Sequence, residues 1–143
     1  MITIKSQICI VTNYASEGTL SSFMKKRKQE RRRITDKEAC CIIKHILKAV
    51  KYLHDKKLIH RDLKPANILI HDKKDFSKIQ LIDFGFCTLC KEPLTKQCGT
   101  LKYMAPTLIK RLHYGLPADI WSVGIIMYML LNKNRHPFFN NSL

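Results

Sequence analysis

The chain has 143 residues, of which 26 are lysine or arginine and 11 are aspartate or glutamate, so its net charge is +15. A hydrophobic fraction of 45% excludes an intrinsically disordered chain, and the length suits a single domain. The positive charge favours an anionic partner, such as a nucleotide, a nucleic acid, an acidic protein or a membrane surface, without choosing among them.

Apolar patterning and cysteine usage indicate an intracellular protein. The first residues, ITIKSQICIVTNYAS, are interrupted by polar side chains and lack the apolar core of a secretory signal. The longest apolar run, residues 120–131, is too short to cross a bilayer. The six cysteines lie in segments typical of an ordinary core, which favours a reducing compartment. A cytoplasmic location is predicted, with the nucleus as the alternative and no membrane attachment.

The first half of the chain predicts one short strand and two helices. Residues 8–11 are β-prone, and residues 20–24 begin a brief helix that runs into the basic sequence KKRKQERRR at 25–33. Thr35 and Glu38 form the T-x-x-E capping box of a second helix. Apolar residues keep helical spacing from there to residue 54.

The second half predicts a hairpin, an irregular segment and a buried helix. Apolar runs at 68–70 and 79–82 flank a polar turn and are typical of a β-hairpin. The irregular segment, residues 83–116, is long enough to indicate function. A hydrophobic helix is predicted from Pro117 to Leu131, with the proline in its first turn.

The sequence HRDLKPANIL, residues 60–69, places a dense set of polar groups directly before an apolar strand. Phosphoryl transfer from ATP needs such a set: a base for the acceptor hydroxyl, a cation for the γ-phosphate and oxygen ligands for Mg²⁺. Asp62 can act as the base, Lys64 as the cation and Asn67 as a neutral metal ligand. Asp83, which opens the sequence DFG, supplies a second, charged ligand.

With these motifs the chain resembles the eukaryotic protein kinases, in which H-R-D-L-x-x-x-N and D-F-G carry the chemistry. CGTLKYMAP (98–106) resembles the end of their activation segment, YGLPADIWSVGIIMYMLL (114–131) the helix that anchors the catalytic loop, and HPF (136–138) the loop after it. The calcium/calmodulin-dependent serine/threonine kinases are the most similar group. The resemblance implies a kinase that uses ATP and Mg²⁺ on a serine or threonine of a protein substrate, as Lys64 and Thr100 also indicate.

The resemblance assigns roles residue by residue. In catalysis Asp62 is the base, Lys64 contacts the γ-phosphate, and Asn67 and Asp83 bind Mg²⁺. IVTNYASEG, residues 10–18, resembles the hinge that contacts adenine. The nucleotide-binding residues implied are Thr12, Asn13, Ala15, Leu69 and Asp83.

Further residues are expected to hold these groups in place. His60 and Phe84 would stack on each other, and Asp119 would hold the backbone of the catalytic loop. Ile126 and Leu130 would underlie the adenine site together with Leu69.

The fold implied is α+β, the mostly helical C-terminal lobe of a protein-kinase-like fold with a short hinge strand and a small β-hairpin. Residues 1–143 would form a partial kinase domain, because the glycine-rich loop, strand lysine and N-lobe that precede the hinge in this family are absent. The late helices of the lobe are absent as well. The A-P-E motif of the family reads Ala105-Pro106-Thr107, so the ion pair made by its glutamate is lost.

Two departures from the family bear on control and on substrate choice. The usual phospho-acceptor, two residues before the Cys-Gly-Thr sequence, is Lys96, with Thr95 beside it. Control by phosphorylation is therefore expected to be absent or moved to Thr95. Carboxylates that read substrate arginines are replaced by Thr19, Ala66 and Met129, so arginine preference is expected to be lost.

Alternatives to an active kinase stay open. The missing elements and Thr107 favour a catalytically inactive pseudokinase-like scaffold or a gene fragment, whereas the complete catalytic motifs favour an enzyme. The basic run at 25–33 fits a nucleic-acid or nuclear-import patch less well than a solvated helix and loop, so nucleic acid is an unlikely partner. Cys87 and Cys90 have C-x-x-C spacing, but no second pair supports a zinc site. The sequence does not indicate the oligomeric state.

Overall fold

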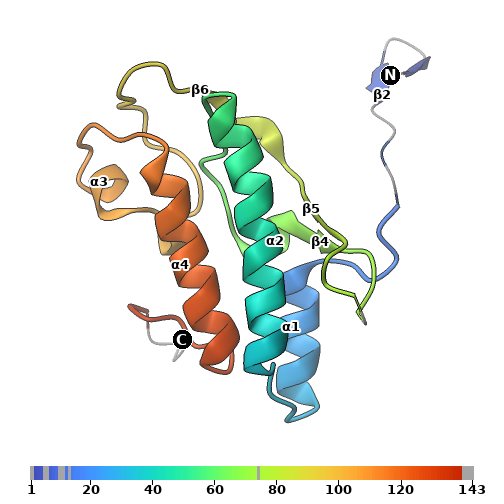
Figure 1. Cartoon of the computed structure of the whole chain (residues 1–143). Coiled ribbons are helices and arrows are strands. Elements are labelled where there is room, and N and C mark those ends of the chain that lie inside the picture. Colours follow the sequence, from blue (N-terminus) through green and yellow to red (C-terminus); the bar gives the residue numbers. More distant parts are fainter. Residues whose placement is uncertain (1, 5–6, 10–11, 13, 74, 140–143) are drawn as a thin grey trace.

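The fold consists mainly of three helices that pack around one hydrophobic cluster (Figure 1). They are α1 (Leu20–Gln29), α2 (Asp36–Asp55) and α4 (Pro117–Leu131). The structure is a computed structural model that describes residues 2–4, 7–9, 12, 14–73 and 75–139. Small antiparallel strand pairs and short helical turns connect the three helices. The predicted combination of helices with a small amount of strand is confirmed.

The capping box predicted at the start of α2 is present. The Thr35 hydroxyl accepts a hydrogen bond from the Glu38 amide at 3.2 Å, and the Thr35 amide donates to the Glu38 carboxylate at 2.8 Å. Arg27 of α1 also donates to Glu38, at 2.5 Å. Burial raises the pKa of Glu38, but the hydrogen bonds from Thr35 and the charge of Arg27 outweigh it and leave the pKa below its usual value. The same carboxylate therefore starts α2 and ties it to α1.

The predicted hairpin is also present. β4 (Ile68–Ile70) pairs antiparallel with β5 (Ile79–Leu81), with Ile68 opposite Leu81. At the N-terminus, β1 (Ile2–Ile4) pairs with β2 (Gln7–Cys9). The strand predicted at 8–11 thus begins one residue earlier, and residues 10 and 11 lie outside the described residues.

One prediction of local structure is confirmed and another needs correction. The basic run after Met24 is the expected helix and loop: α1 continues through Gln29, because lysine, arginine and glutamine are good helix formers. The segment 83–116 is not wholly irregular: β6 (Thr88–Leu89) pairs with β3 (Leu58–Ile59). Its other elements are the 3₁₀ helices η2 (Phe84–Phe86) and η3 (Leu101–Tyr103) and the helix α3 (Pro106–Ile109).

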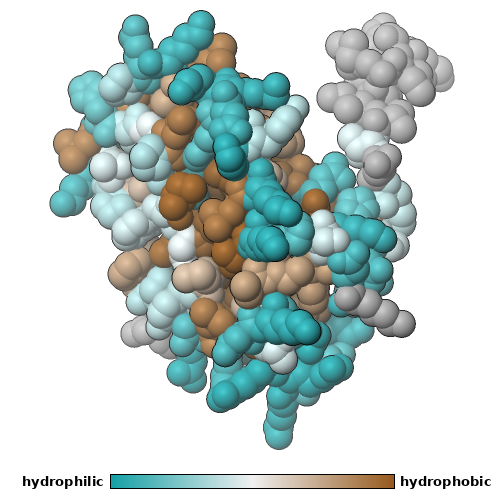
Figure 2. Space-filling model, in the orientation of Figure 1, coloured by the Kyte–Doolittle hydropathy of each residue, from teal (hydrophilic) through white to brown (hydrophobic). Residues whose placement is uncertain are grey.

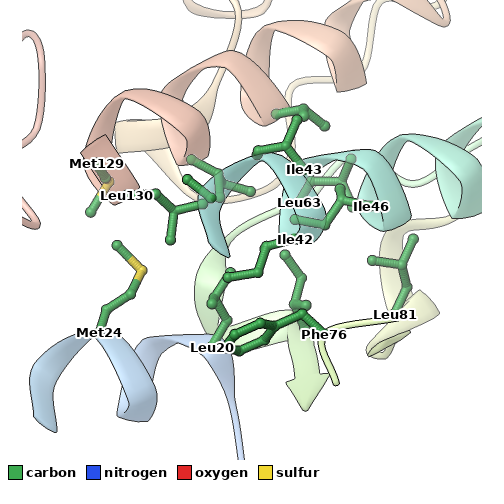
Figure 3. Packing of buried hydrophobic residues seen from close by; sticks show 14 of the residues in the cluster. Leu20, Met24, Ile42, Ile43, Ile46, Leu63, Phe76, Leu81, Met129 and Leu130 are labelled. Carbon is green, nitrogen blue, oxygen red and sulfur yellow. The ribbon is translucent and has the colours of Figure 1, made fainter. Parts of the chain in front are cut away.

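The hydrophobic cluster buries one residue within the catalytic-loop segment and one directly after it. Leu63 of that loop is fully buried, and so is Ile68 directly after it. Figure 3 shows Leu63 among side chains of α2, with Met24 and Leu130 from the two neighbouring helices closing the cluster. Because Leu63 lies between Asp62 and Lys64, its burial sets the position of both polar side chains.

Helix α4 is apolar nearly all round, yet it is not buried all round. Ile120, Met127, Tyr128 and Leu131 are each more than 40% exposed. Figure 2 shows a hydrophobic stripe along the surface between α4 and α2, where Met127 and Leu131 line a groove with Leu47. No described helix has both the length and the apolar character of a membrane span.

We expect this groove to make the 143-residue chain self-associate, because exposed contiguous apolar surface drives association. Replacing Met127 and Leu131 with glutamate should raise the fraction that stays monomeric in sedimentation or light scattering. The double variant Ile109→Glu/Leu112→Glu changes the charge equally at exposed positions outside the groove, and it should leave self-association unchanged. A wild-type chain that is monodisperse at high concentration would contradict the expectation.

Candidate active site

The catalytic-loop segment converges on Asp62, which is 3% exposed. Lys64 Nζ lies 2.7 Å from Asp62 Oδ2, and Asn67 Nδ2 donates to the same oxygen at 3.1 Å. The Thr100 hydroxyl donates to Asp62 Oδ1 at 2.7 Å and accepts from Lys64 at 2.8 Å. The structure therefore brings the three predicted catalytic residues together, and it adds Thr100 to them.

The 3₁₀ helix η1 (Pro65–Asn67) produces this convergence. Its turn, closed by the Asn67 amide donating to the Lys64 carbonyl at 2.9 Å, folds the asparagine back over the loop. Asn67 then donates to the Asp62 carbonyl at 2.9 Å as well as to its carboxylate. A short hydroxyl–carboxylate contact of the kind made by Thr100 shows that a hydroxyl can reach Asp62 at the distance that proton abstraction requires.

Asp119 holds the start of the loop from the first turn of α4 and is 1% exposed. Its Oδ2 accepts from the His60 amide at 2.9 Å and its Oδ1 from the Arg61 amide at 3.0 Å, as expected for the residue that anchors the loop. His54, at the end of α2, adds a third contact at 3.0 Å. No motif in the sequence pointed to His54, since only the tertiary fold brings the end of α2 and the start of α4 together.

The DFG segment lies beside the catalytic loop. The Ile82 amide donates to the Asn67 carbonyl at 3.0 Å, and the Ile82 carbonyl contacts His60 Nε2 at 3.1 Å. The rings of His60 and Phe84 are 5.1 Å apart and tilted by 52°, so the expected stacking is present as a tilted contact. Asp83 thus follows directly on a residue bonded to Asn67.

Asn67 and Asp83 have the chemistry of Mg²⁺ ligands. Asn67 uses its amide nitrogen on Asp62, which leaves its carbonyl oxygen for a cation. Asp83 is exposed, and within the described residues its carboxylate accepts a single long bond of 3.4 Å, from the Gly85 amide. Oxygen donors of this kind suit Mg²⁺, whose remaining ligands are usually phosphate and water oxygens. In the described part of the chain no three His, Cys, Asp or Glu side chains cluster as a metal site.

The predicted nucleotide residues are only partly placed. Leu69 is half-buried, and it alternates with Ile68 and Ile70, whose side chains are in the core. The backbone just after the hinge-like segment is adjacent, because the Ile70 amide donates to the Gly18 carbonyl at 2.9 Å. Thr12 is exposed and Ala15 half-buried, and no hydrogen bond within the described residues links either side chain to the catalytic loop. Asn13 lies outside the described residues.

Arg61 connects the catalytic loop to the activation segment. Its Nε donates to the Phe86 carbonyl at 2.6 Å and its Nη1 to the Tyr114 hydroxyl at 3.2 Å. That hydroxyl donates in turn to the Lys96 carbonyl at 2.6 Å. Burial raises the pKa of Tyr114 above its usual value despite the opposing charge of Arg61, so the phenol keeps its proton and acts as a donor. Sequence reasoning missed Tyr114.

Gly99 makes the close approach of the activation segment possible. Its φ is +98°, and a Cβ at this position would lie 2.3 Å from the Arg61 carbonyl oxygen. Only glycine fits such a contact without a shift of backbone. The segment therefore passes close enough to the catalytic loop for the neighbouring Thr100 to reach Asp62.

The C-x-x-C pair has no support as a metal or redox site. Burial is the main cause that raises the pKa of the Cys87 thiol, with a further contribution from Asp119 and an opposing one from Arg61. A raised pKa keeps the thiol protonated at neutral pH and lowers its reactivity. Cys90 donates weakly to the Glu92 carbonyl at 3.7 Å, and the described cysteines are free thiols.

A buried aspartate with a lysine and an asparagine on one loop, followed by DFG, defines a protein kinase catalytic segment. The chain belongs to the protein kinase family: the model of the protein kinase domain matches residues 1–142. Its identification from the motifs as a member of the eukaryotic serine/threonine protein kinases is confirmed by the relatives that it matches.

Among those relatives is the serine/threonine-protein kinase DCLK1 of Rattus norvegicus, 43% identical over 98 residues, 68% of this chain and 23% of the relative. The probable serine/threonine-protein kinase pXi of Dictyostelium discoideum is 43% identical over 104 residues, 71% of this chain and 15% of the relative. Calcium/calmodulin-dependent protein kinase type 1 of Caenorhabditis briggsae is 38% identical over 109 residues, 76% of this chain and 30% of the relative. The chain thus spans less than a third of the length of each of these three.

Proposed function

We propose that this chain is the catalytic part of a serine/threonine protein kinase, which transfers a phosphoryl group from Mg-ATP to a protein hydroxyl. The observation that supports this most directly is the cluster of Asp62, Lys64, Asn67 and Thr100, because a nearly buried carboxylate there contacts a cation, an amide and a hydroxyl. We assign the chain to a partial kinase domain of the C-terminal-lobe type over residues 1–143, located in the cytoplasm with the nucleus as the alternative.

In this proposal each residue has one task. Asp62 accepts the proton of the substrate hydroxyl, and Lys64 stabilises the negative charge of the transferred group. Asn67 and Asp83 hold Mg²⁺, which supplies charge neutralisation at the phosphates when bound. The nucleotide contacts that we assign, beyond Asp83, are Thr12, Asn13, Ala15 and Leu69.

A catalytically inactive, pseudokinase-like scaffold is the second candidate. Both carboxylate oxygens of Asp62 already accept from side chains of the chain itself, so a substrate hydroxyl would have to approach Asp62 beside Thr100 or in its place. Transfer of labelled phosphate from Mg-ATP to peptides by the full-length protein distinguishes the two. Incorporation that requires Mg²⁺ supports the kinase. ATP binding without transfer, in a folded protein, supports the scaffold.

We predict that the activation segment is held without phosphorylation. Tyr114 already joins Arg61 to the Lys96 backbone, which is the connection that a phosphate would otherwise make. Tyr114→Phe removes both hydrogen bonds and should lower kcat by up to about thirtyfold, since each is worth about 1 kcal/mol and about 1.4 kcal/mol corresponds to a factor of ten. Thr95→Ala should change kcat less than about twofold. Mass spectrometry that finds Thr95 modified in the active protein, with Thr95→Ala inactive, would show instead that the phosphorylation site has moved.

We also predict that arginine in the substrate is not preferred. Met129 is largely buried at the wall of a hollow of about 370 Å³ that is also lined by Lys25, Lys28 and Lys102. Thr19 offers a substrate cation no negative charge, and its hydroxyl caps α1 by accepting a 3.1 Å bond from the Ser22 amide. A substrate arginine near Met129 would therefore meet the positive charges of these lysines.

Ala66, exposed in η1, offers the test of this preference. Kinetics on matched peptides with arginine or glutamate upstream of the acceptor should give kcat/KM at least as high for glutamate. Ala66→Glu should raise kcat/KM for the arginine peptide about tenfold, because a hydrogen-bonded charge pair is worth about 1.5 kcal/mol. Ala66→Gln, of equal size without the charge, should not. A wild-type preference for arginine would overturn the prediction.

A further inference from the structure

The basic run KKRKQERRR folds around a hollow at one end of the three long helices. The hollow has a volume of about 350 Å³, the size of a small-ligand site. It lies where α1 and α4 end and α2 begins, the lower end in Figure 1. Its lining residues Met24 and Leu130 belong to the cluster that also holds Leu63 of the catalytic loop, but no residue of that loop lines the hollow.

Cations from two distant parts of the chain surround this hollow. Those that line it are Arg27, Lys28, Arg31, Arg32, Arg33 and Lys133. No acidic residue is among its lining residues. Hydrophilic side chains also dominate the lower end of the molecule in Figure 2.

Most of these cations have no carboxylate to offset them. Arg27 is paired with Glu38 at 2.5 Å, and Arg32 approaches Glu30 only to 3.9 Å. Within the described residues, Lys28, Arg31, Arg33 and Lys133 form no ion pair. Cations held around one hollow repel each other, so an anion placed among them would relieve repulsion as well as gain attraction.

Complementing the helix dipole explains only part of this charge. Lys26, Arg27 and Lys28 occupy the last turn of α1, where a cation offsets the negative end of the helix. Arg31, Arg32 and Arg33 lie beyond the end of α1, and Lys133 beyond the end of α4. Each helix end contributes about half of one negative charge, far less than the six positive charges around the hollow.

The floor of the hollow is formed by apolar side chains that lie in the core or pack against it. Met24 and Leu130 are each 2% exposed and belong to the main hydrophobic cluster, and Ile34 packs against that cluster. A floor of this kind gives the hollow a fixed shape, whereas a loose basic tail would have none. Arginine guanidinium groups around it match the oxygens of phosphate in bidentate geometry.

We propose that this hollow is a binding site for a compact anion that carries several phosphate groups, either free in solution or as the headgroup of a lipid. The site is separate from the proposed nucleotide site and does not depend on the chain being an active kinase. The chemistry shared by the two sources is a ring or short chain with clustered phosphates that the arginines surround.

The test measures binding to the immobilised chain by surface plasmon resonance at physiological salt. The probes are inositol hexakisphosphate, inositol 1,4,5-trisphosphate, and vesicles containing phosphatidylinositol 4,5-bisphosphate. The site variant is Arg31→Gln/Arg33→Gln/Lys133→Gln. The control variant, Lys78→Gln/Lys91→Gln/Lys110→Gln, removes the same charge at exposed positions that do not line the hollow.

The site variant should weaken binding of inositol hexakisphosphate about tenfold or more, because three charge-assisted contacts are lost, and the control variant less than twofold. Equal weakening by both variants would overturn the proposal, since it would show a general effect of net charge. Tighter binding to vesicles than to the free trisphosphate, lost in the site variant alone, assigns the lipid source; equal binding assigns the soluble one. Site-dependent binding of single-stranded RNA, without binding of the inositol phosphates, would overturn the proposal in favour of a nucleic-acid interface.

Discussion

Replacing Asp62 with asparagine is expected to lower kcat by about 10²–10⁴-fold in the full-length protein, because removal of a general base has an effect of this size. Asparagine keeps the shape of the side chain but cannot take up the proton of the substrate hydroxyl. The KM for ATP should change little, since Asp62 contacts Lys64, Asn67 and Thr100 and is assigned no contact with the nucleotide. Steady-state kinetics on a peptide substrate give both values.

The comparison needs a variant with the same chemical change at a neutral position. Asp36→Asn, at the exposed first residue of α2, should keep kcat within about twofold of wild type. A melting temperature for Asp62→Asn near that of wild type would show that the loss is chemical and not caused by unfolding. Near-normal turnover by Asp62→Asn would contradict the role of Asp62 as the base.

Replacing Asp119 with asparagine is expected to have the largest effect on stability. The carboxylate is almost fully buried and accepts from two backbone amides and from His54. Asparagine would turn an NH₂ group toward one of these donors. The unfolding free energy should fall by about 2–4 kcal/mol, because a buried acceptor is lost and a buried donor is left unpaired. Chemical denaturation followed by circular dichroism measures it.

Asp55→Asn provides the matched control. Asp55 is exposed and pairs with Lys51 one turn earlier at 2.8 Å, and such surface pairs contribute less than about 0.5 kcal/mol. Equal stability of the Asp119→Asn and Asp55→Asn variants would show that Asp119 does not hold the loop. Activity should be lost in the first variant and kept in the second.

Local patterns predicted the helices well. The periodicity and the capping box of α2, and the proline at the start of α4, gave both helices nearly the bounds that the structure has. The helix-forming residues after Met24 indicated that α1 runs into the basic stretch, as it does. The pairing of β3 with β6 could not be predicted, because two-residue strands carry no alternating pattern and their partners are distant in the sequence.

The catalytic loop was predictable for a different reason. Asp62, Lys64 and Asn67 lie within six residues, so one turn of 3₁₀ helix is enough to bring them together. Contacts that cross the fold were not predictable: Tyr114 on Arg61, His54 on Asp119 and the hollow of the basic run all need the packed helices. The sequence showed the charge of that run but not the apolar floor beneath it.

Because the catalytic loop is attached to Asp119, its backbone cannot be fixed until Asp119 has been synthesised. The acceptor for the His60 amide lies 59 residues further along the chain. At the usual speed of translation, about 5–20 residues per second, a ribosome needs about 3–12 s to make that stretch. During this interval the nascent loop has Asp62 and Lys64 but lacks the carboxylate that holds its backbone. A pause in translation before codon 119 would therefore prolong the state in which the loop is open to chaperones and proteases.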